Sequence, residues 1–211
     1  FAVLVTGICP DTLVSLSQPV LNKITSVGKV HGLCFNPDKT QAVLFTNKRT
    51  LIKSDKVKIN KVPVEFSTGA KYLGVWLDQK LNFKKHIEDK ITKCKKHLFA
   101  LKNLVGKSWG PTPALMKWAF TGIVRPKLTY ACHIWGHKMN KTLTNKFQRL
   151  NRLACLCIAN VQKSTPTKGM EIIYNLPPLD IHIQRIGMNN YLRIKYQVQK
   201  SWDGIGHKMN G

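Results

Sequence analysis

Hydrophobic and polar residues follow a β-type pattern in the first part of the chain, up to about residue 83. Residues 57–59 and 62–66 alternate on either side of Asn60 and Lys61, a pair that favours a two-residue hairpin turn. Further short runs rich in Val, Leu and aromatic residues predict strands at residues 1–6, 40–45 and 72–77. We therefore expect short antiparallel strands in this part of the chain.

One helix and one tight turn separate these strands. Apolar residues recur at helical spacing from Leu13 to Ile24, after a start at Pro10, and Pro19 within this stretch predicts a kink. Asn36-Pro37-Asp38-Lys39 has Asn at the first position and Pro at the second, the order typical of a type I turn. Residues 1–83 thus predict a mixed α+β unit.

A 3.6-residue pattern replaces the alternation beyond residue 83 and predicts three basic amphipathic helices in residues 84–160. The second of them runs from Thr112 towards Trp135, with a kink or break expected at Pro126. The first carries its apolar stripe at Ile87, Ile91, Cys94, Leu98, Leu101 and Val105. The third turns Phe147, Leu150, Leu153, Ala154 and Cys157 inward.

Residues 161–211 predict a helical connector. Thr165-Pro166-Thr167 is typical of a helix start, and Leu176-Pro177-Pro178-Leu179 predicts a break. An amphipathic pattern then predicts a helix over residues 181–199. Residues 204–211 contain three Gly and predict a loop.

The charge of the chain adds a functional expectation to this picture. The 211 residues include 34 Lys and Arg against 10 Asp and Glu, a net charge of +24. Within residues 80–160 the balance is 17 basic against 2 acidic side chains, more than solubility requires. Such an excess predicts a polyanionic partner and argues against most enzymes that act on small molecules.

Simpler features exclude other classes of protein. No apolar run approaches the roughly 20 residues of a membrane helix, so we expect no membrane partner. Six Cys are too few for a disulfide scaffold and predict reduced thiols, as in a cytosolic or nuclear protein that is not secreted. The chain starts at Phe1 inside a strand-like run, without a signal-peptide pattern, and we interpret it as a fragment.

Metal and acid–base chemistry find little support in the residue pattern. The one adjacent acidic pair, Glu88 and Asp89, falls on a Lys-rich helix, where pairing with Lys84 and Lys93 explains it. Cys155 and Cys157 are two residues apart on a predicted helix, so they point about 200° apart and cannot easily share a zinc ion. We predict no metal site and no cofactor in this chain.

Lys39 is the most interesting single residue. It follows the predicted turn and precedes a predicted strand, so its position is well defined. A fixed Lys can contact a phosphate or donate a proton to a leaving group, and the simpler alternative is a solvated turn lysine.

The basic helices hold the other candidate site. Their Lys and Arg side chains can neutralise phosphates, whereas the interleaved aromatic residues are more simply explained as core. The predicted nucleic-acid contacts are Lys84, Lys85, Lys93, Lys95, Lys96, Lys102, Arg149 and Arg152.

Several short motifs occur in an order that points to one family. They are Leu33 to Thr46 around the Asn36-Pro37-Asp38-Lys39 turn, Lys71-Tyr72-Leu73-Gly74 to Asp78, residues 81–87, Trp109-Gly110, Pro126 to Trp135, Gln148-Arg149, Thr165-Pro166-Thr167 and Leu176 to Leu179. In order and spacing they resemble the reverse transcriptases of non-LTR retrotransposons, of the jockey-like arthropod type, from just after the active site onwards.

The resemblance implies an architecture. Residues 1–83 would be the C-terminal part of a palm, residues 84–160 an all-helical thumb, and residues 161–211 a connector towards a further domain. In the family the metal-binding Asp residues precede this region, so the chain would lack them, and Mg²⁺ would belong to the intact polymerase. The implied partners are an RNA template, an RNA–DNA or DNA duplex, and the N-terminal palm and fingers of the same polyprotein.

The resemblance also implies roles for single residues. Lys39 matches a lysine proposed to protonate the departing pyrophosphate. Tyr72, Leu73 and Gly74 match the primer grip, which holds the primer 3′ end. The basic helices match the thumb, which holds the template–primer duplex.

Three hypotheses follow. The first is a fragment of an RNA-directed DNA polymerase, a nucleotidyltransferase, that holds the template–primer but lacks the metal-binding aspartates. The second is a non-catalytic nucleic-acid-binding module derived from such an element. The third is an unrelated basic interaction protein. An in-frame Ala-Asp-Asp directly upstream of Phe1 would favour the first, and an initiator Met the second.

Overall fold

The chain divides after Phe83 into two units, an α+β unit (Phe1–Phe83) and a helical unit (Lys84–Gly211). A computed structural model describes residues 2–48, 55–106 and 109–206. The α+β class expected from the sequence is confirmed, with two small antiparallel sheets in the first unit.

The first hairpin joins β1 (Val57–Ile59) to β2 (Val62–Val64). Its turn residues Asn60 and Lys61 have φ values of 50° and 68°, the left-handed pair of a type I′ turn. The hairpin predicted around these two residues is therefore confirmed. The twist of a type I′ turn matches that of the strands it joins, which is why the two-residue loop suffices.

The second hairpin joins β3 (Gly69–Tyr72) to β4 (Val75–Asp78). Its turn consists of Leu73 and Gly74, with φ values of 45° and 81°. The single strand predicted over residues 72–77 is thus wrong, because the chain reverses in the middle of it. The apolar character of Leu73 concealed the turn.

Two other predicted strands do not form. Residues 2–6 are in no strand, and the 40–45 run contributes one isolated parallel bridge, between Ala42 and Phe66. A strand needs a neighbour to accept and donate its backbone hydrogen bonds. Neither run finds such a ladder in the described part of the chain, so its Val and Leu content alone does not make it a strand.

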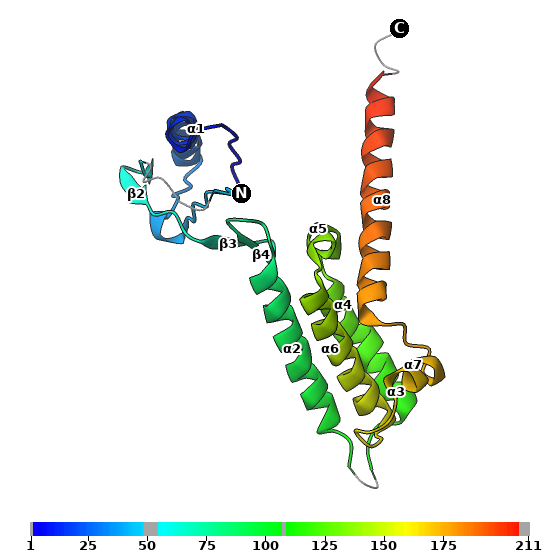
Figure 1. The fold of residues 1–211 in the computed structure, drawn as a ribbon. Coiled ribbons are helices and arrows are strands. Elements are labelled where there is room, and N and C mark those ends of the chain that lie inside the picture. The colour runs from blue at the N-terminus through cyan, green and yellow to red at the C-terminus, as the bar shows by residue number, and fades with distance from the viewer. Residues whose placement is uncertain (1, 49–54, 107–108, 207–211) are drawn as a thin grey trace. The chain divides into compact units, whose positions relative to one another are not determined.

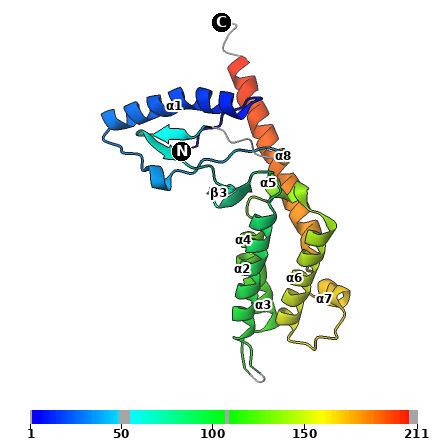
Figure 2. The ribbon, with the colours of Figure 1, turned by 60° about the vertical axis from the view of Figure 1, so that its left-hand side comes forward.

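Helix α1 (Pro10–Val30) packs on strand β1, as Figure 2 shows. It is continuous from Pro10 to Val30, with Pro19, where the sequence predicted a kink, inside it. The Gln18 side chain extends the sheet: its Nε2 donates to Lys58 O and its Oε1 accepts from Lys58 N, both at 2.8 Å. One amide thereby satisfies both backbone groups of an edge-strand residue.

The second unit consists of helices. Among them α2 and α6 contact each other along their lengths (Figure 1). In chain order they are α2 (Lys84–Lys102), α3 (Pro113–Ala119), the π-helical turn η2 (Phe120–Val124), α4 (Arg125–Thr129), α5 (Cys132–Trp135), the 3₁₀ turn η3 (Gly136–Lys138), α6 (Lys141–Ala159), α7 (Thr167–Ile173) and α8 (Leu179–Gly206).

At Pro126, where the sequence predicted a kink or break, the chain stays helical but changes helix type directly before this residue. Pro126 has no N–H, and its ring would meet the Gly122 carbonyl of a regular α-helix. The π turn η2 resolves this conflict just before it, since Arg125 N donates to Phe120 O, five residues back. Helix α4 then ends at Thr129, and Ala131, with a φ of 55°, lies in the turn before α5.

The core of the helical unit centres on Trp135. Its side chain is fully buried, its ring stacks on Phe147 with centroids 6.2 Å apart, and its indole Nε1 donates to Tyr130 O at 3.0 Å. The α2 stripe predicted from the sequence is confirmed at its four buried members, Ile87, Ile91, Cys94 and Leu98. Burial of a stripe of this size stabilises the helix by several kcal/mol, at about 25 cal/mol per Å².

A buried polar junction connects α4, α6, α7 and α8. Arg125, only 6% exposed, donates from Nη2 to Pro177 O at 2.9 Å, and the buried Asn151 donates to Glu171 Oε1 at 2.5 Å. His182 lies near Arg125 and Arg185, and burial followed by these two charges lowers its pKa to about 4. The junction holds the Leu176-Pro177-Pro178-Leu179 segment against the bundle.

Helix α8 is longer than its amphipathic pattern indicated. It begins at Leu179 rather than residue 181 and continues to Gly206, so the loop predicted from residue 204 is wrong for its first three residues. The remainder of that loop, residues 207–211, lies outside the described residues. Once packing has nucleated a helix, each further residue adds a backbone hydrogen bond at little cost in free energy. Gly204 and Gly206 therefore do not prevent the extension.

Asn140 provides a test of the fold. Its Oδ1 accepts a hydrogen bond from Leu143 N at 2.9 Å and caps α6. We expect Asn140→Ala to lower the free energy of unfolding by about 1 kcal/mol. Urea unfolding followed by circular dichroism measures this change. Asn145→Ala, in the exposed middle of the same helix, is the matched control and should not destabilise the protein.

His182 predicts how stability responds to acid. Its pKa is lowered in the fold to about 4 from an ordinary value of 6.5, so the unfolded chain takes up the proton first. Stability should therefore fall as pH decreases from 6.5 towards 4. His182→Gln should remove part of this loss in unfolding curves recorded across that range. Parallel curves for both proteins would assign the acid sensitivity to another group.

Candidate nucleic-acid interface

The exposed lysines of α2 fall on two different faces. Lys84, Lys95 and Lys102 are separated by 11 and 7 residues, close to whole numbers of turns, so they lie along one line of the helix. This line is about 27 Å long at 1.5 Å per residue. Lys85, Lys93 and Lys96 lie farther round, away from the buried stripe. The sequence predicted all six as nucleic-acid contacts and did not assign them to different faces.

Glu88 shows which face the line of Lys84, Lys95 and Lys102 occupies. It lies on the same flank of α2, and its Oε1 accepts a hydrogen bond from Lys146 Nζ of α6 at 2.6 Å. This hydrogen bond, more than any other contact, lowers the pKa of Glu88. The line of lysines therefore borders the seam between α2 and α6.

Helix α6 adds its own cations to this border. Lys146 is half-buried at the seam, and Arg149, one turn further on, is exposed. We name Lys84, Lys95, Lys102, Lys146 and Arg149 the seam cations. Within the described part of the chain, Lys146 is the one seam cation that forms an ion pair, with Glu88.

The second acidic residue of α2 belongs to the other face. Asp89 Oδ2 and Lys93 Nζ are 2.7 Å apart, the i,i+4 pair expected from the sequence. Glu88 also interacts electrostatically with Lys84, as the sequence predicted, but its hydrogen bond goes to Lys146 of the neighbouring helix. Both acidic groups in residues 80–160 are thus neutralised by lysine.

Arg152 does not fit its predicted role. Its guanidinium donates to Thr165 O at 3.1 Å, to Thr167 Oγ1 at 2.5 Å and to Lys163 O. These bonds fasten the loop between α6 and α7, a structural task that the helical spacing did not reveal. We therefore leave Arg152 out of the interface.

Lys90 and Lys127 are two further cations between α2 and α4, and nothing in the sequence singles them out. Lys90 Nζ is 4.8 Å from the centroid of the Tyr130 ring, and Lys127 Nζ is 3.1 Å from His97 Nε2. Lys90 belongs to α2 and Lys127 to α4, so they mark the side of α2 that faces α4 rather than α6. Only the helix packing distinguishes them from the seam cations.

In the first unit, Lys39 is the last residue of the 3₁₀ turn η1 (Pro37–Lys39). Asn36 Oδ1 accepts from Asp38 N at 2.8 Å and Thr40 N donates to Pro37 O at 3.0 Å, so the predicted turn is confirmed. The Lys39 side chain is exposed. Of the two features expected to fix the position of Lys39, the turn before it forms and the strand after it does not.

The turn of the second hairpin presents Tyr72, Leu73 and Gly74 at its tip. Leu73 is 73% exposed and Tyr72 46% exposed. A positive φ is unfavourable for Leu, so this turn stores backbone strain of the order of 1 kcal/mol or more.

The four buried thiols, of Cys94, Cys132, Cys155 and Cys157, are unsuited to metal binding or nucleophilic chemistry. Burial raises the pKa of Cys94 and of Cys155 to about 11, so both stay protonated near neutral pH. Cys157 faces α2, with Sγ 3.9 Å from Leu98 O, whereas Cys155 lies near Arg125. No group of three or more His, Cys, Asp and Glu side chains that could hold a metal ion occurs in the described residues.

The helices of the described chain include none that is both long enough and apolar enough to cross a bilayer.

Comparison with known proteins relates the chain to mobile elements of insects. A probable RNA-directed DNA polymerase from transposon X-element of Drosophila melanogaster is 35% identical over 125 residues, 54% of this chain and 13% of that protein. A putative 115 kDa protein in the type-1 retrotransposable element R1DM of the same species is 21% identical over 203 residues, 94% of this chain and 19% of that protein.

A third relative comes from another fly. The retrovirus-related Pol polyprotein from the type-1 retrotransposable element R1 of Bradysia coprophila is 22% identical over 159 residues, 74% of this chain and 16% of that protein. The chain thus spans less than a fifth of the length of these curated relatives. No family model and no solved structure matches it. The relations speak against an unrelated basic protein, and by sequence the chain is a relative of part of the reverse transcriptases of insect non-LTR retrotransposons.

Proposed function

We propose that the helical unit holds the template–primer duplex of an RNA-directed DNA polymerase. The observation that carries the proposal is the row of seam cations along α2 and α6. Lys84, Lys95 and Lys102 form one line, and Arg149 lies across the seam from it. Backbone phosphates repeat along a duplex, and a row of cations can contact them in sequence.

The chemistry of the row suits a polymerase. An A-form-like hybrid is recognised mainly by shape and phosphate contacts, because its deep major groove is closed to side chains. A polymerase must bind every sequence equally, so lysines on a helix flank serve better than a base-reading element. Acidic side chains are scarce here, and Glu88 and Asp89 are already paired with lysine.

The first unit would form the end of the palm. In this proposal the exposed tip at Tyr72, Leu73 and Gly74 contacts the primer strand, and Lys39 donates a proton to the departing pyrophosphate. The confirmed turn before Lys39 and the strained, exposed turn at Leu73 support these roles. The Mg²⁺ ions would be held by acidic residues of the complete polymerase, beyond this chain.

The seam cations can be tested against the other lysines of the same helix. Replacing Lys84, Lys95 and Lys102 with Ala should weaken binding of an RNA–DNA hybrid and make it less sensitive to salt. The slope of log affinity against log salt concentration should decrease by up to about 2.7, since each lost phosphate contact contributes about 0.9. Fluorescence anisotropy at several salt concentrations measures this slope.

The triple variant Lys85→Ala, Lys93→Ala and Lys96→Ala is the matched control. It removes the same charge from the same helix, at positions that are also exposed. Its salt slope should decrease by less than one. Equal effects of the two triple variants would show that only total charge matters, and an affinity indifferent to salt would rule out phosphate binding.

The role of Lys39 requires the complete polymerase. We expect Lys39→Ala there to slow single-nucleotide addition while leaving hybrid affinity unchanged, because a proton donor acts on the leaving group and not on the duplex. Rapid-quench kinetics and anisotropy measure the two quantities separately. Unchanged turnover would identify Lys39 as a solvated turn lysine.

A further inference from the structure

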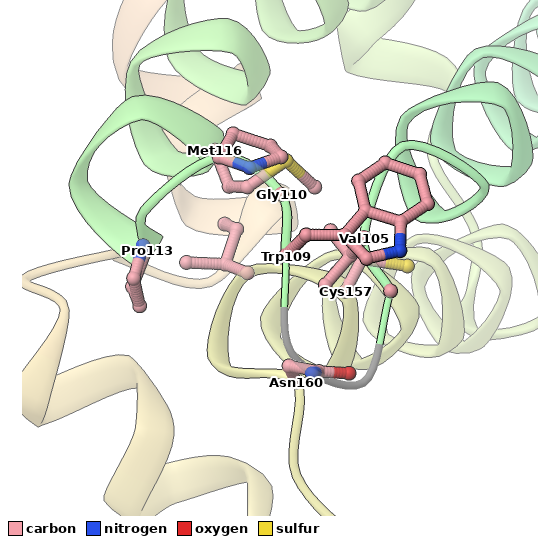
Figure 3. Close-up of a pocket in the computed structure, with 10 residues that line it drawn as sticks. Val105, Trp109, Gly110, Pro113, Met116, Cys157 and Asn160 are labelled. Carbon is pink, nitrogen blue, oxygen red and sulfur yellow. The ribbon is translucent and has the colours of Figure 1, made fainter.

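A pocket of about 300 Å³ lies where the end of α2, the start of α3 and the end of α6 meet (Figure 3). The residues that line it include Val105, Trp109, Pro113, Met116 and Ile158, with the amide side chain of Asn160 beside them. The volume is at the lower end of the range for small-molecule sites, which suits one planar group.

Backbone geometry forms this pocket in advance. Gly106 N donates to Trp109 O at 2.8 Å, and a Cβ on Gly106 would come within 2.3 Å of the indole. Gly110 has a φ of 130°, and a Cβ there would approach Leu104 O to 2.9 Å. Any larger residue at either position would force the wall to shift, so both glycines are needed for its shape.

Trp109 is the unusual member of the wall. Its side chain is 68% exposed, although burying an indole stabilises a protein by several kcal/mol. A large aromatic group kept at the mouth of a preformed pocket is typical of a site that stacks on a flat ligand. The nearby Asn160 can both donate and accept hydrogen bonds, as the edge of a nucleobase does.

Charge indicates the class of ligand. Lys102, the last of the line along α2, ends this helix three residues before Val105 of the pocket wall. The line of lysines therefore leads along α2 to the pocket, and none of the described residues that line it is Asp or Glu. A cationic row ending at an exposed aromatic group is the arrangement by which proteins hold single-stranded nucleic acid.

We propose that this pocket binds one unpaired nucleobase of the nucleic acid held by the seam cations. The base stacks on Trp109, Asn160 contacts its edge, and Lys102 neutralises the adjoining phosphate. This inference rests on the proposed function. The ligand would be the first unpaired nucleotide beyond the end of a duplex, of any sequence, because stacking requires only a π face.

The test compares three probes on the full chain: a blunt RNA–DNA hybrid, the same hybrid with a short unpaired extension, and a hybrid whose extension has the same length but no bases. The extension with bases should bind about 5- to 100-fold more tightly than the abasic one, the range expected for stacking of one base. Trp109→Ala should remove this gain and leave the affinity for the blunt hybrid unchanged. Trp109→Phe should retain most of it.

Trp118→Ala is the matched control, since Trp118 is 65% exposed on α3 but does not line the pocket. It should keep the full gain. The inference is overturned if bases in the extension add nothing, or if both Trp→Ala variants lose the gain equally. An apolar side chain of another protein as the occupant would give the first of these results.

The outcomes separate this inference from the proposed function. Salt-dependent binding of the blunt hybrid that is weakened by the seam variant, with no gain from the extension, contradicts only the pocket. If the blunt hybrid does not bind, but a single strand with bases binds more tightly than an abasic strand in a way that depends on Trp109, only the duplex-holding role is contradicted.

Discussion

The buried seam between α2 and α6 is the constraint on which the helical unit depends. Ile87, Leu98, Phe147 and Leu150 are at most 1% exposed, and such close packing leaves each helix only one rotation about its axis. Lysine side chains are flexible and would tolerate many arrangements. The apolar stripe does not, and its position alone decides which cations border the seam and which point elsewhere.

The positive charge of α2 opposes folding of the helical unit when no ligand is bound. Like charges along one helix repel each other and oppose folding, and solvent screens only part of this repulsion. The two acidic residues of α2 are arranged to relieve it, Glu88 across the seam with Lys146 and Asp89 along the helix with Lys93. Exposed pairs of this kind contribute at most about 1 kcal/mol each. A polyanion bound along the row would relieve far more of this repulsion. Under the proposed function, the ligand would therefore also stabilise the helical unit.

Positive φ values occur in both units. In the first unit they lie in the hairpin turns, at Lys61 and Leu73, and just before α2, at Leu81 and Phe83. In the second unit Ala131 has one in the turn between α4 and α5, and the π turn η2 precedes Pro126. The buried junction of Arg125, Asn151 and Glu171 then holds the connections between α4, α6, α7 and α8, at the price of burying polar groups.

The local elements were largely determined by the sequence. The stripe of α2, the hairpin at Asn60 and Lys61, and the turn before Lys39 follow from spacing and turn chemistry, because each depends on residues close in the chain. The motif order likewise sufficed to point to the family. The excess of positive charge predicted a polyanionic ligand, since charge needs no fold to be counted.

Other features required the tertiary structure, because they depend on residues far apart in the chain. Strands at residues 2–6 and 40–45 fail for lack of a pairing neighbour, which no local pattern reports. The difference between Arg149, exposed at the seam, and Arg152, engaged with the loop after α6, comes from a contact 11 to 15 residues away. The pocket at Trp109 exists only where α2, α3 and α6 converge. Packing, not composition, decided which of many cations border the seam and which aromatic residue lines the pocket.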